Sequence, residues 1–145
     1  MTEVMKGGCL CGAVVYEARG EPAITGHCYC VDCRKTSGTG HCTHVAMRAD
    51  SMRLTGAMSS YRRPADSGNI IERYFCPTCG SPIYSTNAGM PGLVFLRASS
   101  LDDPDQVTPQ MSVFVSRAPK WDVMDAGLPS FAELPEGGPS SVIKD

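Results

Sequence analysis

The stretch Phe75-Cys76-Pro77-Thr78-Cys79-Gly80-Ser81-Pro82 places two cysteines around a proline and next to a glycine. Pro77 fixes its φ at about −65°, and Gly80 accepts a positive φ at no steric cost. This pattern predicts a zinc-knuckle turn whose backbone N–H groups point at the two thiolates. Structural zinc is tetrahedral and binds four ligands, most often thiolates, so the turn needs a second pair of cysteines.

The second pair is found near the N-terminus, in Gly7-Gly8-Cys9-Leu10-Cys11-Gly12. In an extended chain, residues i and i+2 point to the same side, so we expect both sulfurs of this pair to reach one metal ion. Cys9, Cys11, Cys76 and Cys79 are therefore predicted to form one closed four-thiolate site. A redox disulfide between Cys76 and Cys79 is the alternative, but no βαβ pattern surrounds them.

Between these pairs lies a triple, Cys28-x-Cys30-x-x-Cys33. Three protein ligands with one open position are typical of a catalytic zinc site, so these cysteines are the candidate catalytic residues. The triple could instead form a second structural site, closed by Cys42 or by one of the nearby histidines, which are His27, His41 and His44. Cys42 alone is more often a small buried apolar residue than a ligand.

Length and composition bound the class of protein. The chain has 145 residues, a mass of 15.5 kDa and a net charge of −2, which fits one domain over residues 1–145. There is no basic excess for nucleic acid and no apolar run of the ~18 residues that a membrane span needs. Residues 1–8 contain no apolar signal-peptide core. We therefore expect a cytoplasmic protein, in which the clustered cysteines, all of the 8 except Cys42, bind metal rather than form disulfides.

Many short segments rich in β-branched and aromatic residues, separated by Gly and Pro, predict a mainly β fold of short antiparallel strands. Polar residues 34–40 predict one helical turn followed by a loop. We expect a core over about residues 6–131 and an extended tail over 132–145, where prolines disfavour regular structure. The predicted strands are 13–18, 44–48, 52–55, 59–62, 69–75, 82–86, 92–98 and 112–116.

Four motifs together resemble the glutathione-dependent formaldehyde-activating enzyme family, which includes centromere protein V. They are Gly8-Cys9-Leu10-Cys11-Gly12, the run from His27 to Gly38, the run from Phe75 to Pro82, and Leu101-Asp102-Asp103-Pro104. The resemblance implies a β-tent fold held by zinc, with two zinc ions per chain. It implies a structural zinc on Cys9, Cys11, Cys76 and Cys79 and a catalytic zinc on Cys28, Cys30 and Cys33.

The resemblance also implies a carbon–sulfur lyase that joins formaldehyde to glutathione, giving S-hydroxymethylglutathione. Since glutathione is anionic, Arg34 and Lys35, which follow the triple, are the candidate substrate-binding residues. The sequence departs from the family at Ser112, where many members carry His. The alternatives are a non-catalytic zinc-binding interaction module and a thiol or redox sensor. Neither the true substrate nor the oligomeric state follows from the sequence.

Overall fold

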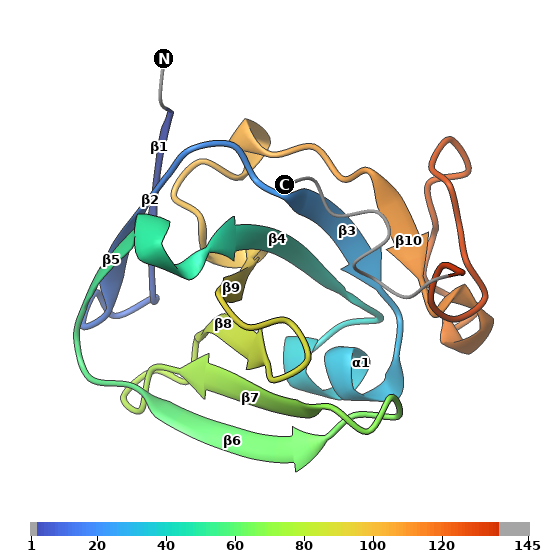
Figure 1. The fold of residues 1–145 in the computed structure, drawn as a ribbon, viewed down its shortest axis with the longest axis horizontal. Coiled ribbons are helices and arrows are strands. Elements are labelled where there is room, and N and C mark those ends of the chain that lie inside the picture. The colour runs from blue at the N-terminus through green and yellow to red at the C-terminus, as the bar shows by residue number, and fades with distance from the viewer. Residues whose placement is uncertain (1–2, 137–145) are drawn as a thin grey trace.

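The computed structural model describes residues 3–136 and contains two β-sheets (Figure 1). The smaller sheet has three strands, β1 (Val4–Gly8), β2 (Val15–Arg19) and β5 (Met52–Thr55), in the order β1-β2-β5. Both of its strand pairs are antiparallel. β1 and β2 form a hairpin, so the connection that carries Cys9 and Cys11 lies at one end of this sheet.

The larger sheet has seven strands in the order β10-β3-β4-β9-β8-β7-β6. Its pairs are antiparallel except for β10 and β3, which run parallel. The predicted mainly β, largely antiparallel fold is therefore confirmed. The strands are β3 (Ile24–Cys28), β4 (Cys42–Arg48), β6 (Ser59–Pro64), β7 (Ile70–Phe75), β8 (Pro82–Asn87), β9 (Leu93–Arg97) and β10 (Met111–Val113).

Alternation along β4 and β9 separates a core face from a face that carries polar groups. Val45 lies opposite Leu96 and Met47 opposite Val94, and all four side chains belong to the buried apolar core. Directly opposite residues of an antiparallel pair share a face of the sheet, and successive residues alternate between faces. Cys42 and His44 on β4 and Arg97 on β9 alternate with these core residues and are therefore directed to the other face.

One α-helix, α1 (Val31–Ser37), connects β3 to β4 within the described part of the chain. Cys30 is its N-cap, with an extended backbone, and Gly38 ends it in the left-handed region at φ 79°. The helix begins before the single turn predicted over residues 34–40, because the Cys30 side chain caps it. Cys33 is therefore a buried helical residue. The 3₁₀ helices are η1 (Ala49–Ser51), η2 (Ala98–Ser100), η3 (Pro104–Gln106) and η4 (Val115–Arg117).

Several local expectations need correction. Cys9 and Cys11 lie in the β1–β2 turn and not in a strand, so their common direction comes from the turn. The expected strand over 112–116 divides into β10 and the 3₁₀ helix η4, since Phe114 between them has φ 56°. β1 and β3 were not predicted as strands. Residues 137–145 of the expected tail lie outside the described residues.

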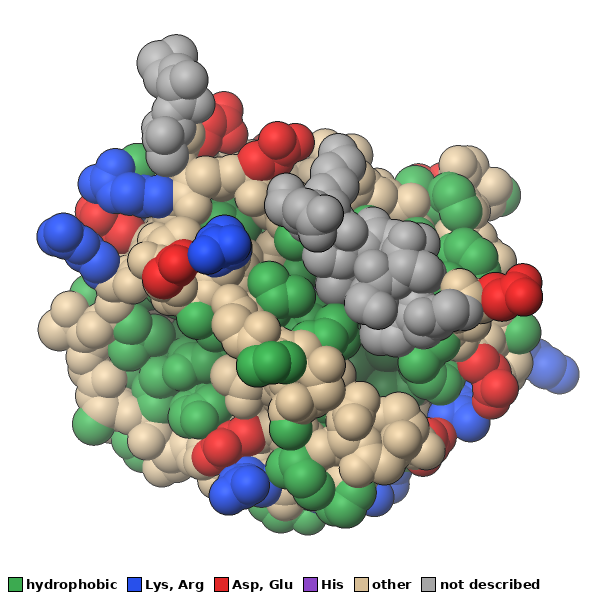
Figure 2. Space-filling view, viewed as in Figure 1, with side chains coloured by type: hydrophobic (Ala, Val, Ile, Leu, Met, Phe, Trp, Pro, Cys, Tyr) green, Lys and Arg blue, Asp and Glu red, His purple; other side chains and the backbone are tan. Residues whose placement is uncertain are grey.

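The face drawn in Figure 2 carries charged side chains of both signs around its edge, with hydrophobic side chains gathered between them. Phe114 and Val115 donate backbone hydrogen bonds to the Glu133 and Phe131 carbonyls, which hold the segment before residue 137 against the end of β10. Among residues 3–136, no helix is long and apolar enough to cross a membrane.

Candidate metal centres and the cavity beside them

Four thiols from two distant turns meet between the two sheets. Cys9 and Cys11 come from the β1–β2 turn, and Cys76 and Cys79 come from the connection between β7 and β8. All four Sγ atoms lie within 4.8 Å of one another. Cys11 Sγ is 3.6 Å from Cys9 Sγ and 3.7 Å from Cys76 Sγ.

The four-cysteine donor set fits zinc. A tetrahedron with metal–sulfur bonds of about 2.3 Å has edges of about 3.8 Å, which these separations approach. A disulfide needs sulfurs about 2.05 Å apart, and all eight cysteines are free thiols in this structure. The arrangement argues against a disulfide between Cys76 and Cys79. These residues could hold a zinc ion that ties the smaller sheet to the larger one.

The knuckle turn forms as its sequence predicts. Gly80 has φ 76°, and its N–H donates to the Cys76 carbonyl at 2.8 Å. Ser81 Oγ lies 3.2 Å from Cys79 Sγ, and the hydrogen bonds from Ser81 lower the pKa of the Cys79 thiol to about 5. On the other turn, the Val14 N–H donates to Cys9 Sγ at 3.2 Å. These hydrogen bonds therefore favour the thiolate forms of Cys79 and Cys9 before any metal binds.

The second set of thiols is local. Cys28 ends β3, Cys30 caps helix α1 and Cys33 lies in its first turn, and their Sγ atoms are all within 4.8 Å of one another. The Cys33 N–H donates to Cys30 Sγ at 3.3 Å. Hydrogen bonds from the Cys28 and Cys30 thiols hold the pKa of the Cys33 thiol well below its usual value. These three soft donors could hold one zinc ion and supply three of its four ligands.

Two residues of β4, Cys42 and His44, contact Cys33. The Cys42 thiol donates to the Cys33 carbonyl at 3.0 Å, and His44 Nε2 lies 3.3 Å from Cys33 Sγ. The ligand atoms of Cys33, Cys42 and His44 form a further group within 4.8 Å. Cys42 is buried, as expected of a lone cysteine, and it also takes part in the hydrogen bonding of this site.

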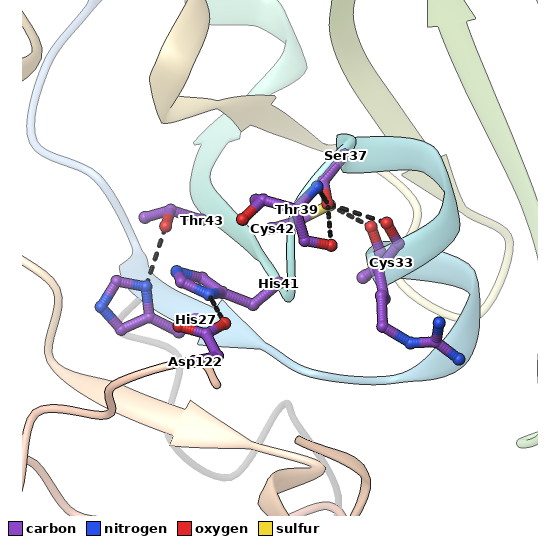
Figure 3. A network of polar contacts seen from close by, with 9 residues as sticks. His27, Cys33, Ser37, Thr39, His41, Cys42, Thr43 and Asp122 are labelled. Atoms are coloured by element: carbon purple, nitrogen blue, oxygen red, sulfur yellow. Dashed lines mark hydrogen bonds and ion pairs between the residues drawn. The ribbon is translucent and has the colours of Figure 1, made fainter. Parts of the chain in front are cut away.

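A cavity of about 360 Å³ adjoins Cys42, and Figure 3 shows several of the residues that line it, among them His27 and His41. Cys42 lines it and so connects it to Cys33. The imidazoles of His27 and His41 also line it, edge to face at 4.8 Å between ring centroids. The remaining lining residues are Ser37, Thr39, Thr43, Pro82, Arg97, Ala98, Ser99, Pro104, Val107 and Pro109.

Both imidazoles of the cavity are fixed by a second group. His27 Nδ1 is 2.8 Å from Thr43 Oγ1, and His41 Nδ1 is 2.6 Å from Asp122 Oδ2. Gly40 makes room for this carboxylate, because a Cβ at position 40 would overlap it. His41 therefore has a set orientation, with Nδ1 facing the carboxylate.

The remaining predicted residues lie around the triple. Arg34 and Lys35 occupy the last turn of α1, where Lys35 is exposed and Arg34 is half-buried. Tyr29 is buried and packs on His41 with ring centroids 4.7 Å apart, which agrees with a packing role. Ser112 is fully buried on β10 beside His27, and its hydroxyl has no partner among the described residues.

Some residues of the site were not predicted. Asp122 and Thr43 carry no local motif, and their contacts depend on chain segments brought together by the fold. Arg97 is the last residue of the apolar strand β9 and is 4% exposed. The one sequence signal for Arg97 as a site residue is a charge next to an apolar run. Such a charge usually marks only the end of a strand.

Comparisons with known proteins agree with this arrangement. A model of the family described as glutathione-dependent formaldehyde-activating enzyme matches residues 4–117. A protein of Halomonas elongata, provisionally named a glutathione-dependent formaldehyde-activating enzyme, is 29% identical over 124 residues, which span 81% of this chain and 79% of that protein.

A crystal structure of a Rhodobacter sphaeroides protein is similar in fold, with a TM-score of 0.56 at 22% identity. The likeness covers 88% of this chain and 99% of that one. The family match includes both turns of the four-cysteine group and the whole cysteine triple. By its sequence, the chain belongs to the glutathione-dependent formaldehyde-activating enzyme family.

Proposed function

We propose that this protein is a zinc enzyme that adds a thiol such as glutathione to formaldehyde, acting as a carbon–sulfur lyase in the reverse direction. The observation that carries the proposal is the separation of seven thiols into a group of four and a group of three. Four thiolates saturate a tetrahedral ion, whereas three leave one position for a substrate thiol. We infer two zinc ions per chain, a structural one at the four-cysteine group and a catalytic one at the triple.

Zinc bound at the triple would stabilise the thiolate form of a substrate thiol near neutral pH. The protein's own residues position that ligand. Cys30 and Cys33 are held by the first turn of α1 and by the N–H of Cys33, so two of the three sulfurs have fixed directions. The cavity beside Cys42 gives the rest of the substrate a place next to the triple.

In the addition, the substrate sulfur attacks the formaldehyde carbon, a carbon–sulfur bond forms, and the thiol proton ends on the former carbonyl oxygen. His41 lines the cavity and has its Nδ1 held by Asp122, so Nε2 is the ring atom left to exchange that proton. Arg34 and Lys35, in the last turn of α1, are the proposed partners of the glutathione carboxylates. Proximity of the two reactants supplies the remaining rate enhancement.

The family resemblance also leads us to assign the two sheets to the β-tent fold. Free thiols and glutathione both require a reducing compartment, so we propose a cytoplasmic location. A redox sensor is the second candidate, because the Cys42 sulfur lies within 4.8 Å of Cys33 Sγ and offers a thiol beyond those the metals need. A sensor would release metal on oxidation without binding glutathione.

Cobalt substitution tests the proposed function. We expect a protein with two cobalt ions per chain whose charge-transfer bands change saturably, with one glutathione bound per chain. S-methylglutathione, in which the sulfur is blocked, is the control and should leave the bands unchanged. If both metal sites are filled and glutathione has no effect on the spectrum, the protein does not bind its substrate through sulfur at the triple, and the proposal is wrong.

A further inference from the structure

Two arginines of the larger sheet have a buried Nε without a partner among the described residues. Arg97 on β9 is 4% exposed, and the hydrogen bond of its guanidinium within residues 3–136 is from Nη2 to Thr36 Oγ1 at 3.2 Å. Arg73 on β7 is half-buried. Burying a cation costs several kcal/mol unless an anion is close, so a negative charge is expected nearby.

The strand register places Arg97 next to the cysteine triple. Arg97 lies directly opposite His44 in the β4–β9 pair, so the two side chains share a face of the sheet. His44 Nε2 is 3.3 Å from Cys33 Sγ. Thr36, the hydrogen-bond partner of Arg97, lies one turn after Cys33 on the same helix. The guanidinium is therefore held between the sheet and the helix that carries Cys30 and Cys33.

The strand register places Arg73 on the same face of the larger sheet as Arg97. Arg73 lies opposite Ser85 on β8, and Ser85 lies opposite Phe95, two residues before Arg97 on β9. Both arginines are therefore on the face of the sheet that carries Cys42 and His44, whose ligand atoms lie within 4.8 Å of Cys33 Sγ.

The buried guanidinium of Arg97 favours an anionic fourth ligand at the triple. Three thiolates and one divalent ion carry a net charge of −1, and a fourth thiolate makes it −2. The guanidinium of Arg97 is stabilised by that additional negative charge, whereas a neutral ligand such as water or imidazole adds none.

We propose that Arg97, assisted by Arg73, is a positioning residue that makes the three-cysteine site selective for a negatively charged fourth ligand, a thiolate, over a neutral one. The proposal rests on the metal site of the proposed function, and it deepens that function by naming what sets the ligand preference. It also excludes a second metal ion on Cys33, Cys42 and His44, because the arginines repel another cation there.

The test uses the cobalt-substituted protein with two small probes, azide as an anion and imidazole as a neutral ligand. Both are followed through the cobalt spectrum, and glutathione is titrated separately. The variants are Arg97→Met, Arg73→Met and Arg97→Lys. Arg48→Met is the matched control, since Arg48 lies on β4 but is exposed and paired with Asp50.

We expect Arg97→Met to weaken azide and glutathione binding about tenfold while imidazole affinity changes less than about twofold, because only an anion gains from the guanidinium. Arg73→Met should also weaken azide and glutathione binding, but by a smaller factor. Arg97→Lys should recover part of the azide affinity, and Arg48→Met should change neither probe. A merely structural role would lower the affinities for azide and imidazole together.

The proposal is overturned if Arg97→Met leaves azide binding intact, or if azide and imidazole binding fall by the same factor. A wild-type site that takes neither probe, or a wild-type protein with three metal ions per chain, also overturns it. If the wild-type protein binds azide but not glutathione, the proposed function is wrong, whereas the proposed selectivity of the site for anionic ligands is retained.

Discussion

At the scale of single residues, both thiol groups receive hydrogen bonds from the backbone or side chains of their own turns. Val14 and Ser81 contact Cys9 and Cys79 in the four-cysteine group, and the Cys33 N–H donates to Cys30 Sγ in the triple. Thiolates that accept hydrogen bonds from neutral groups remain ionised at lower pH. The hydrogen bonds of Ser81 therefore favour the thiolate form of Cys79.

Replacing Ser81 by alanine tests the effect of its hydroxyl on Cys79. Ser81 Oγ contacts Cys79 Sγ at 3.2 Å and accepts from the Leu10 N–H at 3.1 Å. The side-chain and backbone hydrogen bonds of Ser81 lower the pKa of Cys79 to about 5, so loss of the side-chain bond should raise that pKa. Protons compete with zinc for thiolates, so a higher pKa means that acid displaces the metal at a higher pH. We expect Ser81→Ala to release one of two zinc ions at a higher pH than wild type.

The measurement is a pH titration of zinc release in the presence of a chromogenic chelator. Ser67→Ala, in the β6–β7 turn, is the control and should release zinc as wild type does. A midpoint that stays at the wild-type pH in Ser81→Ala would show that the Ser81 hydrogen bond does not govern Cys79.

The candidate ligands could be predicted from the sequence because their spacing carries the information. Cys76 and Cys79 are held by a turn whose proline and glycine specify its geometry, and Cys30 and Cys33 are one helical turn apart. His44 is one of three nearby histidines that the sequence suggests as a closing ligand, but which of them contacts Cys33, and where Arg97 lies, depends on the register of β4 with β9. No pattern local to either residue encodes that register.

At the scale of elements, the hairpin of β1 and β2 packs against the segment that follows β9. Gly7 on β1 bridges to Leu101, and Asp102 donates its N–H to the Lys6 carbonyl at 2.8 Å. The Tyr16 hydroxyl, on β2, lies 2.6 Å from Ser100 Oγ in the core. This contact fixes the end of the hairpin that presents Cys9 and Cys11.

Gly7→Ala should destabilise this junction. A Cβ at position 7 would overlap the Ser100 carbonyl and the Tyr16 hydroxyl, and the backbone carbonyl cannot move away alone. Overpacking of this kind costs about 1–3 kcal/mol and sometimes more, so the melting temperature should fall by several degrees. Thermal unfolding by circular dichroism is the measurement. Gly127→Ala, next to a side-chain oxygen at 3.2 Å, is the control, and an equal melting temperature for both variants would contradict the expected crowding.

Most strands could be predicted, and the exceptions have a physical reason. β7 and β9 are rich in β-branched and aromatic residues, and they form within a few residues of the predicted ends. β1 and β3 contain glycines and have little intrinsic preference for strands, so they were missed. Both are held by their neighbours, β1 by β2 and β3 by β4 and β10. For these two strands, pairing with neighbouring strands determines the extended conformation, because the local sequence preference does not.

At the scale of the whole molecule, the two thiol groups connect very different lengths of chain. The four-cysteine group joins the turn of the three-stranded sheet to a connection of the seven-stranded sheet, and Cys11 and Cys76 are 65 positions apart. The triple spans only the end of β3 and the first turn of α1. A metal ion at the first group closes a long loop between sheets, whereas one at the second constrains a short segment.

This difference predicts opposite outcomes for mutations in the two groups. Structural zinc contributes about 10–16 kcal/mol of apparent binding free energy, comparable to the total stability of a domain, about 5–15 kcal/mol. Cys9→Ser and Cys76→Ser should therefore give unfolded or insoluble protein. Cys30→Ser should stay folded, retain one zinc ion and lose glutathione binding. Circular dichroism melting with metal analysis on each variant is the measurement, and Cys42→Ser is the control, since Cys42 belongs to neither proposed ligand set. If Cys30→Ser unfolds while Cys9→Ser melts like wild type, the structural and catalytic roles of the two groups are reversed.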